Sequence, residues 1–337
     1  MKLSHIKSLA SRFGIDPFLI GLIFAILLAY LWPKPGIQEG FFSLQEVANL
    51  GVSVIFFFYG LRLSAAKLIA GLSNWKLHLT IQMTTFVAFP LFLLLLFFTF
   101  GQGEYEVLWL GTFYLAALPS TVSTSVVMVS IAGGNIPAAI FNASISSLIG
   151  VFITPVWMGL FLTTQTGGYD LGGIIIKLIF QVVVPVILGV VLNVKWGTFA
   201  ETHRQKLRLF DQFIILLIIY TSFSDSFARR MFQDYQLSHL LLLSIGMVAL
   251  FFIMLGFVNL VSKLLKFNKE DRIAAIFCGS KKSLVHGTVM SKVLFPDAAG
   301  VGIILLPLML YHALQIIFSS IIARRLAKRA GSNQHPQ

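Results

Sequence analysis

Long apolar stretches follow one another along the chain, separated by short polar connections. The hydrocarbon core of a bilayer is about 30 Å thick, so a helix that crosses it needs about 20 mainly apolar residues. Ten stretches meet or approach this length: about 15–33, 44–62, 76–100, 106–130, 136–163, 173–194, 208–227, 238–264, 270–293 and 299–323. The pattern predicts an all-α polytopic membrane protein with ten transmembrane helices, formed by residues 1–337 as a single transmembrane unit.

The composition supports this interpretation. Apolar residues make up 57% of the chain and the mean hydropathy is +0.87. Charged residues make up only 11%, whereas an ordinary soluble domain has about 25%. These values exclude a soluble globular enzyme, a disordered chain and a nucleic-acid-binding domain. The single cysteine, Cys278, excludes an internal disulfide.

The net charge of +12 reflects topology rather than a nucleic-acid partner. With the N-terminus placed inside, 18 of the 25 lysines and arginines fall in inside segments and only four fall outside, at Lys34, Lys177, Arg229 and Arg230. Cytoplasmic segments of membrane proteins carry such an excess of basic residues. The distribution therefore predicts that both termini are cytoplasmic.

Ten spans divide into two sets of five. Because each set has an odd number of spans, the second set enters the membrane from the opposite side. This inverted-repeat arrangement is common among secondary transporters. We therefore expect two inverted five-helix repeats.

Polar residues interrupt the fourth and ninth predicted spans. Residues 118–125 read LPSTVSTS and residues 278–283 read CGSKKS. Pro119 lacks a backbone donor and Gly279 relaxes helicity. Unwound backbone at membrane depth is tolerated only where it is buried in protein or lines a wet cavity. These features predict that helices four and nine are discontinuous and form an ion or anion site. The alternative is a proline kink whose hydroxyls bond to the preceding turn.

Two adjacent lysines, Lys281 and Lys282, lie in the ninth predicted span. A lysine at the centre of a transmembrane helix costs about 2.5–3.5 kcal/mol on insertion scales and is a functional candidate by default. Alternatively, the span starts later and the two side chains extend to the interface. The fourth, fifth and ninth spans contain no acidic residue except at their ends, at Glu106, Glu270 and Asp271. Lysines without nearby carboxylates favour an anionic solute.

Hydroxyl and amide side chains accompany the lysines. The candidate ligands for an ion or a polar solute are Ser123, Thr124, Ser125, Asn142, Ser146 and Ser283. Such side chains also hold transmembrane helices together by hydrogen bonds. His286 and His312 are candidate proton relays, or else packing residues with a hydrogen bond.

Four segments resemble the bile acid:sodium symporter family, in the branch that holds the seventh human member and related bacterial transporters. They are LPSTVSTSVVMVSIAGGNIPAAIFNASISSLIGVFITP (118–155), FCGSKKSLVHG (277–287), PLMLYHALQ (307–315) and KLHLTIQ (76–82). In effect the resemblance covers the whole chain. It implies a core domain, a panel domain and a solute site between them. It also implies that helices four and nine cross where they break. The core would come from about 76–163 and 238–323, and the panel from about 15–62 and 173–227.

The resemblance also implies sodium ligands near Ser123, Thr124 and Asn142. However, when the family's fifth-helix ligands are aligned strictly on Asn135, alanines fall at two of the ligand positions. The family's ninth-helix glutamate and glutamine, aligned on Gly279, fall on Phe277 and Lys281. A lysine thus replaces a sodium ligand. The coupling ion is then either sodium at the implied site or no ion at all, with a lysine in its place.

These observations predict a secondary transporter that moves a small organic anion by alternating access in a bacterial inner membrane. Lys281 and Lys282 would hold the charge of the solute or replace sodium. We expect no other cofactor, no nucleic-acid partner and no enzymatic activity. Two alternatives stay open: a non-transporting membrane regulator on the same fold, and an intramembrane enzyme that uses Ser283 and a histidine.

Overall fold

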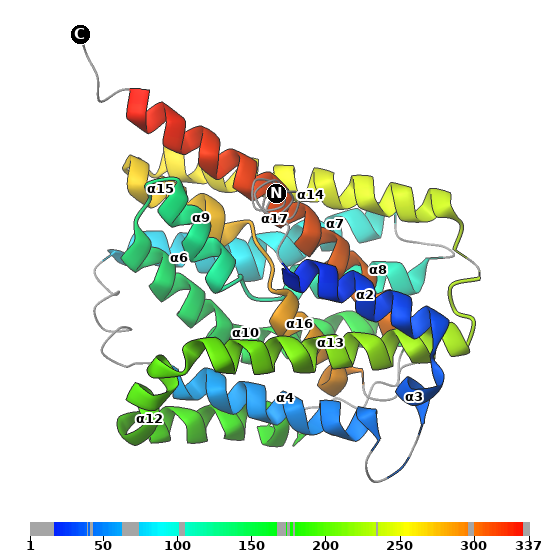
Figure 1. The fold of residues 1–337 in the computed structure, drawn as a ribbon. Helices are drawn as coiled ribbons and strands as arrows, with labels where there is room; N and C mark the ends of the chain where they lie inside the picture. Colours follow the sequence, from blue (N-terminus) through cyan, green and yellow to red (C-terminus); the bar gives the residue numbers. More distant parts are fainter. Residues whose placement is uncertain are drawn as a thin grey trace, which may run out of the picture.

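The computed structural model describes residues 17–38, 40, 43–62, 74–100, 105–166, 173, 176–177, 179–233, 235–295 and 300–332 (Figure 1). The regular structure of this part of the chain is entirely helical. The first residues of the first predicted span and part of the sixth lie outside the described residues.

Seven helical segments of the described chain are long and apolar enough to cross a bilayer. They are α4 (Leu44–Leu61), α6 (Trp75–Met83) continued through the π-helical turn η2 (Thr84–Ala88) into α7 (Phe89–Phe100), α10 (Ile136–Thr166), η3 (Ile179–Val183) continued into α12 (Val184–Thr202), α13 (Arg204–Ala228), α14 (Leu237–Leu264) and α17 (Val301–Ser332). The all-α membrane-spanning class is therefore confirmed.

The remaining predicted spans are occupied by shorter helices. The first holds α2 (Pro17–Leu31), which is followed by the short helix α3 (Lys34–Ile37). The fourth is divided into α8 (Glu106–Ala117) and α9 (Ser123–Ile131), and the ninth into α15 (Lys269–Gly279) and α16 (Leu284–Leu294). Pro119 lies inside the first interruption, and Gly279 is the last residue of α15, directly before the second. Both segments with polar interruptions are therefore broken.

The helices form two sets that make more contacts within themselves than with each other. The first helix set comprises α2, α3, α4, η3, α12 and α13; Figure 1 shows α4, α12 and α13 running alongside one another in the lower part of the view. The second helix set comprises α6–α10 and α14–α17. The main contacts between the sets are made by α13 with α16 and α17, and by α4 with α16.

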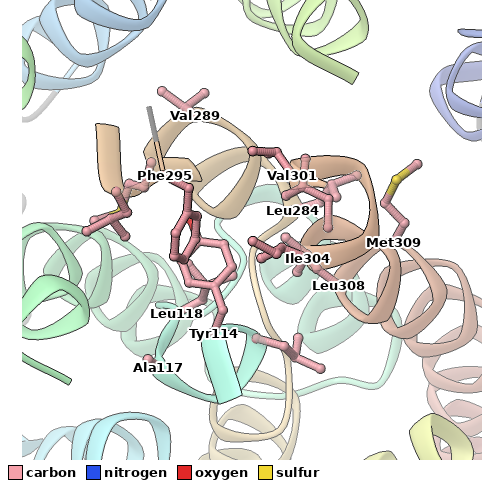
Figure 2. Close-up of a cluster of buried hydrophobic side chains, with 14 of the residues drawn as sticks. Tyr114, Ala117, Leu118, Leu284, Val289, Phe295, Val301, Ile304, Leu308 and Met309 are labelled. Atoms are coloured by element: carbon pink, nitrogen blue, oxygen red, sulfur yellow. The ribbon is translucent and has the colours of Figure 1, made fainter. Parts of the chain in front are cut away.

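An apolar cluster fixes the helix ends beside the two breaks. Figure 2 shows Tyr114 and Leu118 at the end of α8 packed with Leu284 of α16 and Ile304 and Leu308 of α17. These side chains are all at most 2% exposed. The Tyr114 hydroxyl also donates to the carbonyl of Gly287, at 2.6 Å. The cluster therefore holds α8, α16 and α17 in a fixed relation around the unwound segments.

Two glycines allow α4 and α12 to approach backbone to backbone. A Cβ added at Gly60 of α4 would overlap the carbonyl oxygen of Val186, and one added at Gly189 of α12 would overlap that of Phe57. Such close approach through small residues is a common way to pack helices in membranes, where lipid supplies no hydrophobic force between them. The contact therefore depends on both glycines.

We predict that Gly60→Ala and Gly189→Ala each lower the free energy of unfolding by about 1–3 kcal/mol, the usual cost of overpacking. Thermal unfolding of the purified protein in detergent measures this. Gly256→Ala in α14 is the matched control, because an added Cβ there meets no atom within 4 Å. An unchanged stability of either Gly60→Ala or Gly189→Ala contradicts the prediction.

Candidate functional site

The two unwound segments touch each other through hydrogen bonds. The amide of Ser283 donates to the carbonyl of Pro119, at 2.9 Å. The hydroxyl of Ser120 donates to the carbonyl of Cys278, at 2.5 Å, and the amide of Ser120 donates to the Ser146 hydroxyl on α10, at 3.0 Å. The polar groups that helix breaking releases are thus paired across the two segments.

Lys282 has an ammonium group enclosed by backbone oxygens. Its side chain is fully buried, and Nζ donates to the carbonyls of Thr85 (2.8 Å), Ala116 (2.6 Å) and Leu118 (2.8 Å). Nζ also lies 4.2 Å from the centroid of the Phe89 ring. An ammonium group has three N–H donors, and each has one acceptor here. Lys282 therefore fills a complete cation site built from carbonyl oxygens.

These oxygens are free because local helical hydrogen bonding stops where they lie. The last carbonyls of an α-helix have no intrahelical partner and carry the negative end of its dipole. Ala116 and Leu118 lie at the end of α8, and Thr85 lies in η2. The carbonyl of Ala117 between them accepts from the Thr154 hydroxyl instead, at 2.8 Å. The ammonium group of Lys282 thus supplies the donors for buried carbonyls of α8 and η2.

Lys281 points to a different partner. It is also fully buried, and Nζ donates to the carbonyl of Thr124 at the start of α9, at 3.1 Å. A chain of hydroxyls surrounds this contact: Thr124 donates to Thr121 (2.8 Å), Thr121 and Ser125 share a hydrogen bond (2.7 Å), and Ser125 donates to the carbonyl of Phe277 (3.0 Å). Because both lysines are 0% exposed, the alternative that they extend to the interface is wrong.

Gln315 of α17 clamps the peptide that bears Lys282. Its Oε1 accepts from the amide of Lys282, at 2.9 Å, and its Nε2 donates to the Lys282 carbonyl, at 2.8 Å. The predicted site residue His312 contacts this amide, with 2.9 Å between its Nδ1 and Gln315 Nε2. The hydroxyl of Tyr311 donates to the carbonyl of Ser280, at 2.6 Å. Gln315 and Tyr311 were not predicted, although a polar residue in an apolar helix is a usable signal.

Asn142 lies in a separate polar group on α6 and α10. Its Nδ2 is 2.7 Å from His78 Nδ1, and its Oδ1 accepts from Gln82, at 3.2 Å. Within the described chain no hydrogen bond joins Asn142 to Ser123 or Thr124, and Ser123 is exposed. The three implied sodium ligands therefore share no direct contact through hydrogen bonds.

Ser283 and His286 form a helix cap. The Ser283 hydroxyl accepts from the amide of His286, at 3.3 Å, and lies 3.0 Å from His286 Nδ1. This is the usual arrangement at an N-cap, with the partner three residues on. The His286 ring packs against Phe56 and Tyr59 of α4, with centroids 6.3 and 5.5 Å away. No carboxylate in the described part of the chain is bonded to His286, so the pair lacks the orienting group of a catalytic triad.

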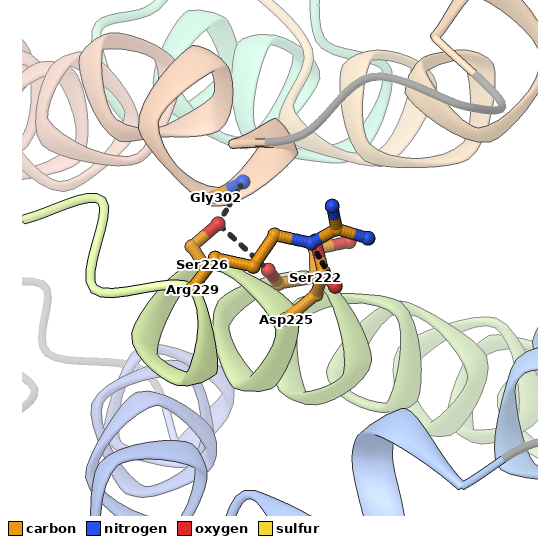
Figure 3. Close-up of polar contacts among 5 residues, drawn as sticks. All are labelled: Ser222, Asp225, Ser226, Arg229 and Gly302. Carbon is orange, nitrogen blue, oxygen red and sulfur yellow. Dashed lines mark hydrogen bonds and ion pairs between the residues drawn. The ribbon is translucent and has the colours of Figure 1, made fainter.

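Polar contacts across the two helix sets gather at one end of the molecule. Lys292 of α16 donates to Gln45 of α4, at 3.1 Å, and to Thr221 of α13, at 3.3 Å. Figure 3 shows the neighbouring contact, in which the amide of Gly302 on α17 donates to the Ser226 hydroxyl on α13, at 3.2 Å. A further contact lies toward the other end of α4, where the Tyr59 hydroxyl donates to the carbonyl of Ser144, at 2.9 Å.

The sequence matches a family of transporters along nearly its whole length. The model of the SBF-like CPA transporter family (DUF4137) matches residues 16–328. "Uncharacterized protein PA2026" of Pseudomonas aeruginosa is 39% identical over 94% of this chain and 95% of its own. "Putative symporter YfeH" of Escherichia coli is 33% identical over 96% of both chains, and "Sodium/bile acid cotransporter 7" of Rattus norvegicus is 33% identical over 90% of both.

We predict that Gln315→Leu lowers the free energy of unfolding by at least about 2 kcal/mol, because it leaves both polar groups of the Lys282 peptide without a partner, at about 1–3 kcal/mol each. Gln82→Leu is the matched control: its amide makes bonds of 3.2 and 3.4 Å and its Oε1 has no partner among the described residues. Thermal unfolding of the purified variants measures the difference. A larger loss of stability in Gln82→Leu than in Gln315→Leu contradicts the prediction.

Proposed function

The chain belongs to the SBF-like CPA transporter family, and on that premise we propose that it is a secondary transporter that moves a small organic anion by alternating access. The family and the named relatives are transporters rather than enzymes, which removes the alternative of a serine enzyme. The names of two relatives describe a symporter and a sodium/bile acid cotransporter. Those names describe the relatives, and this chain requires its own argument for solute and coupling ion.

We propose ten transmembrane helices in two inverted five-helix repeats. In support, helices occupy each predicted range in order, and one helix in each half is broken. The first helix set would be the panel and the second the core. The distribution of basic residues supports cytoplasmic termini, and the bacterial relatives support a bacterial inner membrane.

The single observation that carries the coupling proposal is the oxygen cage around Lys282. Carbonyl oxygens that converge at a helix break are what a hard cation binds, and here an ammonium group occupies that position. A sodium ion and an ammonium group each carry one positive charge, and both are stabilised by oxygen atoms. The lysine can therefore do the electrostatic work of a bound ion. Lys281 donates to one carbonyl, that of Thr124, and neither buried lysine is available to the solute.

The contacts between panel and core support a rocking motion. Hydrogen bonds of Lys292 and Gly302 join the two sets at one end, and the bond from Tyr59 to Ser144 joins them toward the other end of α4. With the proposed orientation the end that holds Lys292 and Gly302 faces the periplasm, and we interpret these contacts as closing that side. Breaking these hydrogen bonds would let the core move against the panel and open the periplasmic side.

We predict that anion transport does not depend on sodium. Uptake of labelled cholate or 4-phenylbutyrate into proteoliposomes should differ by less than about twofold between sodium and potassium buffers, because Lys282 replaces the ion. Strict dependence on sodium would instead favour a sodium site at Ser123, Thr124 and Asn142. Binding without flux in either buffer would favour the non-transporting regulator.

We also predict that Lys282→Ala makes stability depend on sodium. Removing the ammonium leaves three buried carbonyls without a donor, at about 1–3 kcal/mol each, and sodium can then enter the cage. The melting temperature of the variant should fall and be partly restored by sodium chloride but not by choline chloride. Lys292→Ala is the matched control, because among the described residues Lys292 donates to side-chain oxygens of Gln45 and Thr221 and to no backbone carbonyl. Equal melting temperatures in the two salts contradict the cage.

A further inference from the structure

We infer that Arg62 binds the acid group of the transported anion, at the boundary between α4 and the second helix set. The inference rests on the proposed function, which needs a cation that the solute can reach. Lys281 and Lys282 are completely buried, and Lys292 is held between three helices by two side chains. The side chain of Arg62 is 24% exposed and thus accessible.

The guanidinium group of Arg62 is fixed in place with donors to spare. Arg62 follows the last residue of α4. Its Nε donates to the carbonyl of Phe58, at 3.0 Å, and its Nη2 donates to Asp211 of α13, at 2.8 Å. Within the described residues Nη1 has no partner. A planar guanidinium group held in one orientation suits a carboxylate or sulfonate, which it can bind through two N–H groups.

The neighbours of Arg62 place it beside the core domain. Tyr59 lies three residues earlier on the same helix, so the two side chains share a face. The Tyr59 hydroxyl donates to Ser144 of α10, and its ring contacts His286 of α16. The Phe58 ring packs edge-on against Phe210, with centroids 5.6 Å apart. A solute bound at Arg62 would therefore meet aromatic rings, which favours an acid with an apolar body.

Asp211 balances the charge of Arg62 and competes with the solute. Only its Oδ2 is bonded to Arg62; its Oδ1 is buried and has no partner in the described part of the chain. Another Arg–Asp pair lies at the far end of α13, where Arg229 and Asp225 are also 2.8 Å apart (Figure 3). That pair lies within one helix and is largely exposed, so it provides a matched control.

The test measures binding of three acids, 4-phenylbutyrate, decanoate and cholate, and of their neutral amides, to the full-length protein in nanodiscs and potassium buffer. Wild type should bind at least one acid at least 10-fold more tightly than its amide. Arg62→Gln should abolish that preference, and Arg229→Gln should keep it. Asp211→Asn should tighten acid binding several-fold, because it frees Arg62. Should Arg62→Gln fail to fold, Asp211→Asn and Arg62→Lys provide the test. Arg62→Lys keeps the positive charge but loses the planar guanidinium group, so it should weaken acid binding.

An unchanged preference in Arg62→Gln overturns the inference, as does loss of acid binding in Asp211→Asn, which would indicate a purely structural ion pair. Uptake of the same acid into proteoliposomes separates the two proposals. Uptake that Arg62→Gln leaves intact overturns the role of Arg62 and keeps the transporter. Binding that needs Arg62 without uptake overturns the transporter and keeps the site. If the wild-type protein binds none of the acids more tightly than its amide, the result overturns both the Arg62 site and the proposal of an anionic solute.

Discussion

Every backbone polar group that a broken helix exposes at membrane depth must find a partner inside the protein, and this requirement organises the second helix set. The ammonium group of Lys282 donates to three carbonyls from the end of α8 and from η2. Gln315 bonds to both the amide and the carbonyl of Lys282 itself. Ser120 and Ser283 pair the two breaks with each other. Since these bonds share the same short segments, removing any one donor disturbs several acceptors at once.

The same requirement explains which parts of the structure could be predicted. The two breaks were predictable because Pro119 and two lysines interrupt apolar runs, and such interruptions are legible in the sequence. The acceptors were not, because Lys282 lies 166 residues from Ala116 and 197 from Thr85. Asn142 illustrates the limit: the sequence analysis named it as a candidate ligand, but its contact with His78 depends on how α6 packs against α10.

The two helix sets are stabilised in different ways, and the difference suits relative motion. The first set uses close backbone packing at Gly60 and Gly189, which needs no polar group at membrane depth. The second is held by buried hydrogen bonds around the breaks. Between them lie aromatic contacts such as Tyr59 with His286 and a few hydrogen bonds to single side chains. This difference agrees with the proposed movement of the core against the panel.

A cation that is part of the chain has an energetic consequence for the proposed transport. A sodium ion that enters with a solute brings its own gradient and balances the solute's charge, whereas the ammonium group of Lys282 stays with the protein in every cycle. Moving one net charge across the membrane is worth about 2.3 kcal/mol per 100 mV. A monoanion carried alone therefore enters against an interior-negative potential and leaves with it. Accordingly, if Lys282 replaces sodium as proposed, transport favours export of the anion, or its exchange for another anion, over its accumulation.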